Sequence, residues 1–120
     1  MTGWQLTMSA GILVRMILAG VSLSASETYH YQAPVSLLHE LVIGQVVTCC
    51  GPRYEALRTV NNRACISRPS IIVVPATTED VAIAVNFAGR NGLEVSVRSG
   101  GHGYTCTNIR DGGLHLDLRR

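Results

Sequence analysis

From residue 70 onward, the hydrophobic and polar positions change from a strand pattern to a helix pattern and back. The run Ile71–Val74 is apolar and β-branched and ends at Pro75, as in a strand buried on both faces of a parallel sheet. Residues 77–80 (Thr-Thr-Glu-Asp) predict a helix start, because a threonine can cap the first turn and carboxylates there meet the positive end of the helix dipole. The predicted apolar stripe of this helix consists of Val81, Ala84, Val85 and Ala88. Residues 91–92 (Asn-Gly) are a typical helix end.

A second strand is predicted directly after this helix. Three apolar residues alternate there with polar ones, as in a half-buried strand: Leu93, Val95 and Val97. A strand, a helix and a strand with short connections form a βαβ unit. We therefore expect the strands at 71–74 and 93–97 to be parallel, with a right-handed crossover.

A third strand is predicted at residues 114–118, after the turn sequence Asp-Gly-Gly at 111–113. Its three leucines fall on one face, and we expect His115, on the other face, to lie at the surface. If the strand packs against elements beyond Arg120, its leucine face is expected to be exposed here on an unpaired edge, which favours aggregation.

The segment 27–68 predicts a region of short helices and loops. Five apolar residues lie near helical spacing in its first half: Leu37, Leu38, Leu41, Val42 and Ile43. Residues 49–52 (Cys-Cys-Gly-Pro) are typical of a turn. Residues 53–62 predict a second short helix, with Tyr54, Leu57 and Val60 at three-residue intervals.

The amino-terminal segment 1–26 predicts a secretory signal peptide. An apolar run at 16–23 follows Arg15 and precedes small residues, and it is too short to span a bilayer. Four cysteines allow three disulfide pairings in a secreted chain: Cys49, Cys50, Cys65 and Cys106. Because adjacent cysteines bond to each other only with strain, we expect Cys49 or Cys50 to pair with one of the other two.

Composition narrows the function classes. The ten basic residues are all arginine and are scattered, the net charge is only +2, and the chain has one Trp and one Phe. Nucleic-acid binding is not expected, because neither a basic stripe nor a stacking platform is visible. A metal site is not expected either, because the cysteines and histidines lack the usual ligand spacing.

The candidate chemistry lies in the stretch Arg98-Ser99-Gly100-Gly101-His102-Gly103-Tyr104, which follows the strand at 93–97. Ligands bind at the carboxyl ends of parallel strands, and consecutive amides without bulky side chains suit anionic oxygens. The pattern is not a Walker loop, since the chain contains no lysine, nor a complete dinucleotide fingerprint, since Cys106 takes the third glycine position. The residues alone leave a cofactor loop and a structural glycine turn equally open.

Taken together, several short motifs resemble one family. They are residues 69–75 (Pro-Ser-Ile-Ile-Val-Val-Pro), 79–81 (Glu-Asp-Val), 97–104 (Val-Arg-Ser-Gly-Gly-His-Gly-Tyr), 111–114 (Asp-Gly-Gly-Leu) and 116–118 (Leu-Asp-Leu), with Tyr54 and residues 61–63 (Asn-Asn-Arg) upstream. This order is similar to the FAD-binding domain of berberine-bridge-enzyme-like oxidoreductases, in the vanillyl-alcohol-oxidase superfamily. The resemblance covers roughly residues 45–120.

The resemblance implies a fold and a cofactor. The fold class is α+β or α/β, the amino-terminal part of a PCMH-type FAD-binding domain with a small parallel βαβ sheet flanked by helices. The domain is expected to begin at residue 69 and to be incomplete at 120. FAD would be held at residues 98–104, with His102 bonded covalently to the flavin. The pyrophosphate would be held by the amides of Ser99, Gly100, Gly101, Gly103 and Tyr104. Arg98 would add charge or be a solvated strand end, and Cys106 would be a structural or free thiol.

The resemblance also implies what the chain lacks. Family members are several times longer, so we expect an amino-terminal fragment that is inactive by itself. In its full-length form it would be a secreted oxidase of a small organic substrate. The alternative is a small secreted domain with disulfides and no enzymatic activity. A nicotinamide-dependent enzyme is disfavoured by the incomplete fingerprint.

Overall fold

The computed structural model describes residues 33–119, and the predicted signal peptide at residues 1–26 lies outside this range. The elements in chain order are α3 (Val35–Leu41), β1 (Gln45–Thr48), α4 (Pro52–Arg58), β2 (Ile71–Val74), α5 (Thr78–Arg90), β3 (Val95–Arg98), the 3₁₀ turn η1 (Cys106–Asn108) and β4 (Leu114–Asp117). The predicted helices near residues 37–43 and after residue 76 are confirmed. Of the helices described, none has the length and apolar character needed to cross a membrane.

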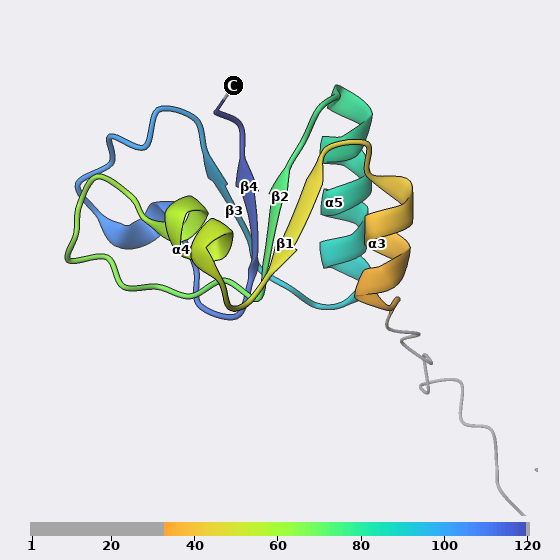
Figure 1. The fold of residues 1–120 in the computed structure, drawn as a ribbon, viewed down its shortest axis with the longest axis horizontal. Helices are drawn as coiled ribbons and strands as arrows, with labels where there is room; N and C mark the ends of the chain where they lie inside the picture. Colours follow the sequence, from red (N-terminus) through yellow and green to blue (C-terminus); the bar gives the residue numbers. More distant parts are fainter. Residues whose placement is uncertain (1–32, 120) are drawn as a thin grey trace, which may run out of the picture.

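The four strands form one mixed sheet in the order β1-β2-β4-β3. β4 is parallel to both of its neighbours, β2 and β3, so the two strands that flank α5 are parallel as predicted, with β4 between them. β1 pairs antiparallel with β2, and the sequence patterns did not predict this strand. Figure 1 shows α3 and α5 on one side of the sheet and α4 on the other. The predicted mixture of helices and a small sheet is confirmed.

The face of the sheet under α3 and α5 is apolar, and we call it the aliphatic face. Its buried side chains come from both helices and two strands: Leu38, Ile71, Val73, Ala84, Phe87, Ala88, Leu114 and Leu116. Within α5 the buried stripe differs from the predicted one, because Phe87 is buried whereas Val85 is exposed. The helix is therefore rotated slightly from the orientation that its aliphatic residues alone suggest.

The start of α5 is fixed by a capping box between Thr77 and Asp80. The threonine hydroxyl accepts from the Asp80 amide at 3.2 Å, which confirms the predicted cap. The two Asp80 carboxylate oxygens also accept from the Ile43 and Gly44 amides, each at 2.9 Å. Burial acts to raise the pKa of Asp80, but the amide hydrogen bonds outweigh it and leave that pKa below its usual value. One carboxylate therefore joins the loop before β1 to the start of α5.

The second helix is shorter than predicted and ends at Arg58. Tyr54 and Leu57 of α4 pack on Ile72 in the centre of the sheet, and Val60 is buried in the segment that follows the helix. The Tyr54 hydroxyl donates to the Pro69 carbonyl at 2.7 Å, and burial raises its pKa. Short as it is, α4 covers β1 and β2 on the face of the sheet opposite to α3 and α5.

Strand β3 reverses the expected burial pattern. Ser96 and Arg98 are buried, whereas Val95 and Val97 are 38% and 48% exposed. The two valines lie on the aliphatic face, in register with β4 leucines, but β3 is an edge strand beyond the cover of α5. The half-buried strand is therefore confirmed, but its covered side is the polar one.

Strand β4 is buried along its whole length, and two predictions about it are wrong. His115 is fully buried, not at the surface, because β4 is a central strand between β2 and β3 and the ring lies beside buried Ser96. Leu114 and Leu116 are also buried, so the leucine face is not an exposed edge; only Leu118, beyond the strand, is partly exposed.

Candidate functional site

The glycine-rich stretch begins at a buried arginine. The Arg98 guanidinium donates to the Asp117 carboxylate at 2.6 Å, to the Leu57 carbonyl at 2.5 Å and to the Thr59 carbonyl at 2.6 Å. The predicted solvated strand end is therefore wrong. Because both carbonyls lie at the end of α4, Arg98 fastens the carboxyl end of β3 to that helix as well as to β4.

The carboxylate of Asp117 lies between two arginines. It accepts from buried Arg98 and from Arg119, whose Nη2 lies 2.7 Å from Asp117 Oδ2. Burial favours the protonated acid, but the hydrogen bonds from Arg119 and Arg98 outweigh burial, so the pKa of Asp117 falls well below its usual value. The pair is thus ionised at neutral pH.

A second polar pair lies beside this ion pair on the same face. His115 Nδ1 is 2.9 Å from the Ser96 hydroxyl, and both side chains are buried. Burial and the nearby Arg98 charge lower the pKa of His115 to about 4, although Asp117 acts in the opposite direction. Its Nε2 has no hydrogen-bond partner within the described residues. The imidazole is therefore neutral at neutral pH.

Beyond Arg98 the backbone of residues 99–104 forms an open loop. Gly101 has φ +72°, a left-handed conformation that favours glycine, and a Cβ on Gly103 would overlap the Asn108 side chain. Among the described residues, none accepts a hydrogen bond from the amides of Ser99 to Tyr104. The loop therefore presents several backbone donors with little side-chain bulk around them, as anion-binding loops do.

His102 and Tyr104 are held from the segment that follows α4. The Asn61 amide nitrogen lies 3.0 Å from His102 Nδ1, and the Asn62 side chain donates to the Tyr104 carbonyl at 2.8 Å. These residues and Gly103 line a surface recess of about 410 Å³. The Tyr104 side chain is 92% exposed. The structure thus brings the predicted loop together with the upstream asparagines, about 40 residues earlier in the chain.

The cysteine pairing differs from the one expected. Cys49 bonds to Cys50, and Cys65 bonds to Cys106. The first pair lies where β1 leads into α4, and Cys50 takes a left-handed backbone (φ 88°) there. The second pair joins segments 59–70 and 99–113, which run beside each other away from β1 (Figure 1). Proximity in the fold therefore decides the pairing, and Cys106 is a structural, bonded cysteine.

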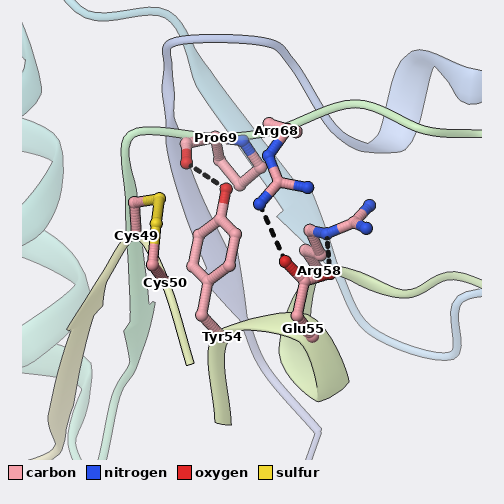
Figure 2. The surroundings of a disulfide bond; sticks show 7 residues. All are labelled: Cys49, Cys50, Tyr54, Glu55, Arg58, Arg68 and Pro69. Atoms are coloured by element: carbon pink, nitrogen blue, oxygen red, sulfur yellow. Dashed lines mark hydrogen bonds and ion pairs between the residues drawn. A yellow bond between two sulfur atoms is a disulfide. The ribbon is translucent and has the colours of Figure 1, made fainter. Parts of the chain in front are cut away.

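The adjacent disulfide lies near a small charged surface on α4. Figure 2 shows it with Tyr54, whose hydroxyl bonds to the Pro69 carbonyl, and with Glu55, which pairs with Arg58 and Arg68. Hydrogen bonding to Arg68 is the main reason that the pKa of Glu55 is lowered, and burial acts in the opposite direction. No three metal-ligating side chains gather anywhere in residues 33–119.

Sequence reasoning missed two residues that fix this site. Asp117, the partner of Arg98, belongs to the motif at residues 116–118 but has no predicted role of its own, and Thr59 supplies a carbonyl that no sequence pattern marks. A signal for Asp117 did exist, since an acid in one strand and an arginine in a neighbouring strand can face each other. The strand register that makes them face each other, Arg98 opposite Asp117, becomes visible only in the fold.

Comparison with known proteins identifies the domain. Residues 69–120 match the family model described as an FAD binding domain. (R)-6-hydroxynicotine oxidase of Paenarthrobacter nicotinovorans is 40% identical over 76 residues, which are 63% of this chain and 17% of that protein. Residues 69–120 therefore correspond to an FAD binding domain, and the chain is similar to FAD-linked oxidoreductases. The relationship predicted from the sequence motifs is therefore confirmed.

A further relative and two solved structures are also similar to this chain. Chitooligosaccharide oxidase of Gibberella zeae is 39% identical over 54 residues, 43% of this chain and 11% of that protein. The crystal structure of 6-hydroxy-D-nicotine oxidase from Arthrobacter nicotinovorans superposes with a TM-score of 0.62 at 38% identity, over 64% of this chain and 17% of that one. Physcomitrella patens BBE-like 1 gives a TM-score of 0.65 at 26% identity, over 72% of this chain and 19% of that one. The chain thus spans less than a fifth of the length of each of these relatives.

Proposed function

We propose that residues 98–104 form the flavin-attachment loop of an FAD-dependent oxidase that acts on a small organic substrate. The observation that carries the proposal is the row of free amides at Ser99 to Tyr104 beside the exposed imidazole of His102. The match of residues 69–120 to an FAD binding domain and the oxidases among the relatives support it. FAD would supply the acceptor for the hydride, which carries the two electrons of the oxidation.

The residues of the loop fit a dinucleotide. Backbone N–H groups can donate to the oxygens of a pyrophosphate. The lack of a Cβ lets Gly101 pack against Arg98 and Gly103 against Asn108, so these glycines allow the loop to take this shape. Arg98 is committed to Asp117 and to backbone carbonyls, so its part is to fix the start of the loop rather than to touch the phosphates through its guanidinium. Asn61 orients the ring of His102, the residue we propose as the covalent attachment point.

The attachment is tested in the flavoprotein that carries this chain. Denaturation should leave the yellow colour on the protein, whereas His102→Ala should release the flavin into the supernatant after precipitation. His39→Ala is the matched control, because His39 is also exposed but lies on α3, away from the loop. Full retention of flavin by the His102→Ala protein after denaturation would exclude His102 as the attachment residue.

We also propose that the protein is secreted. Two disulfides in the described residues support a location in an oxidising compartment. Amino-terminal sequencing of the protein recovered from the culture medium tests this; a product found only inside cells, with residues 1–26 still attached, would contradict it.

A further inference from the structure

The connection between β3 and β4 is long; it comprises residues 99–113, and we call it the glycine loop. Between Arg98 and Leu114, the described residues form only the short turn η1. The apolar support near η1 is a cluster of three buried residues, Val60, Cys65 and Ile109. So small a cluster buries little surface, and a loop without many packed side chains needs another source of order.

Three successive links join this loop to the segment after α4. Asn61 contacts His102, Asn62 donates to the Tyr104 carbonyl, and Cys65 bonds to Cys106. The first two are exposed hydrogen bonds, which compete with water and are weak individually. The third is covalent and closes the series, with the two Cα atoms 5.3 Å apart and a sequence separation of 41.

We propose that the Cys65–Cys106 disulfide is a positioning cross-link for the glycine loop. It holds the two asparagines against His102 and Tyr104, so that the imidazole and the loop amides are already arranged before a ligand arrives. Preorganisation of this kind lowers the entropy that a ligand must overcome on binding. The choice of FAD as that ligand rests on the proposed function, whereas the ordering of the loop does not.

The Cys49–Cys50 disulfide provides a matched control. Cys49 and Cys50 are neighbours in sequence, so their bond joins no distant segments, and they lie between β1 and α4 rather than in the loop. Removing either disulfide deletes one S–S bond and two sulfur atoms. Only the loss of the Cys65–Cys106 bond is expected to free the loop.

The experiment compares the chain with Cys65→Ser/Cys106→Ser and Cys49→Ser/Cys50→Ser variants by ¹⁵N relaxation. In the first variant, amide order parameters at residues 99–108 should fall below about 0.6, with those of α5 unchanged. The ring signals of His102 should also move toward those of exposed His39. The second variant should keep the native values at 99–108. Unchanged order parameters and ring signals in the first variant would overturn the proposal.

A further variant separates the loss of the cross-link from unfolding of the chain. Cys65→Val with Cys106→Ala keeps an apolar side chain against Val60 and Ile109 while the covalent bond is absent. FAD titration of the same proteins separates the two ideas, because affinity should weaken about tenfold or more when the cross-link is lost. Suppose that the loop becomes disordered when the cross-link is lost, but that neither the native protein nor any variant binds FAD. That result would support the cross-link and contradict the proposed function. Native affinity in a chain with a disordered loop would defeat the cross-link as a positioning device.

Discussion

The two faces of the sheet are stabilised by different physics. The aliphatic face packs Leu114 and Leu116 of β4 beneath α5, so it gains from the removal of apolar surface from water. The opposite face, which we call the polar face, buries the Arg98–Asp117 ion pair and the Ser96–His115 hydrogen bond under α4 and the segment after it. Alternate residues of the same two strands thus serve an apolar core and a buried polar layer.

The difference matters for the candidate site, because the glycine loop starts from the polar face. Arg98 is both the last residue of β3 and the centre of the buried network. Apolar packing is non-directional, whereas a guanidinium with one carboxylate and two carbonyl partners fixes an orientation. We infer that the aliphatic face holds the sheet together and that the polar face sets where the loop begins.

The largest effect should come from breaking the ion pair on one side only. Arg98→Met leaves the Asp117 carboxylate buried with only Arg119 as a charged partner, and it is expected to cost about 3–5 kcal/mol of unfolding free energy. Urea denaturation measures this loss. The control is Arg98→Met combined with Asp117→Leu, which removes both charges and should recover much of the stability. A single variant as stable as the native chain would show that the polar face is not held by this pair.

Truncation of a buried side chain on the aliphatic face should lower the free energy of unfolding somewhat less. Leu116→Ala removes buried methyl groups between β4 and α5 and is expected to cost about 2–5 kcal/mol, depending on how far the cavity closes. Val97→Ala is the control, because Val97 is the register partner of Leu116 on the same face but is half-exposed at the edge. It should change stability by no more than about 0.5 kcal/mol. Equal losses in the two variants would mean that the aliphatic face extends over β3.

The two faces also differ in how far the sequence predicts them. The runs at 71–74 and 114–118 and the cap at Thr77 identify two strands and a helix start, because apolar runs and caps are local signals. Strand β1 was not predicted, because its only apolar residues are Val46 and Val47, between polar neighbours. Its strand form depends on pairing with β2, which no local pattern states.

For the candidate site, the sequence predicts the motif but not which of its residues are buried. The glycines and His102 stand out in the sequence, whereas the burial of Arg98 and His115 follows from the strand order, which inserts β4 between β2 and β3. A polar residue at an alternating position is ordinarily assigned to the solvent side. That rule failed for Ser96, Arg98, His115 and Asp117 together, since both faces of this sheet are covered. The pairing of the cysteines depended on the same long-range arrangement.

The smallest effect is a pH dependence confined to the polar face. The pKa of His115 is lowered to about 4 in the folded chain, whereas an unfolded histidine titrates near 6.5. As pH falls below 6.5, His115 becomes protonated in the unfolded chain, but in the folded chain it stays neutral until about pH 4. The free energy of unfolding therefore decreases between pH 6.5 and pH 4. The contribution at pH 5 is about 2 kcal/mol relative to pH 7.

The measurement is urea denaturation at pH 7 and pH 5 of the native chain and of a Ser96→Ala/His115→Leu variant. The variant removes both members of the hydrogen-bonded pair, so it leaves no unpaired serine and no titrating ring on the polar face. Its stability should change about 2 kcal/mol less between the two pH values than that of the native chain. Equal changes of the unfolding free energy in the two proteins would mean that groups other than His115 cause the pH dependence. The difference between the two faces would then rest on the Arg98–Asp117 ion pair alone.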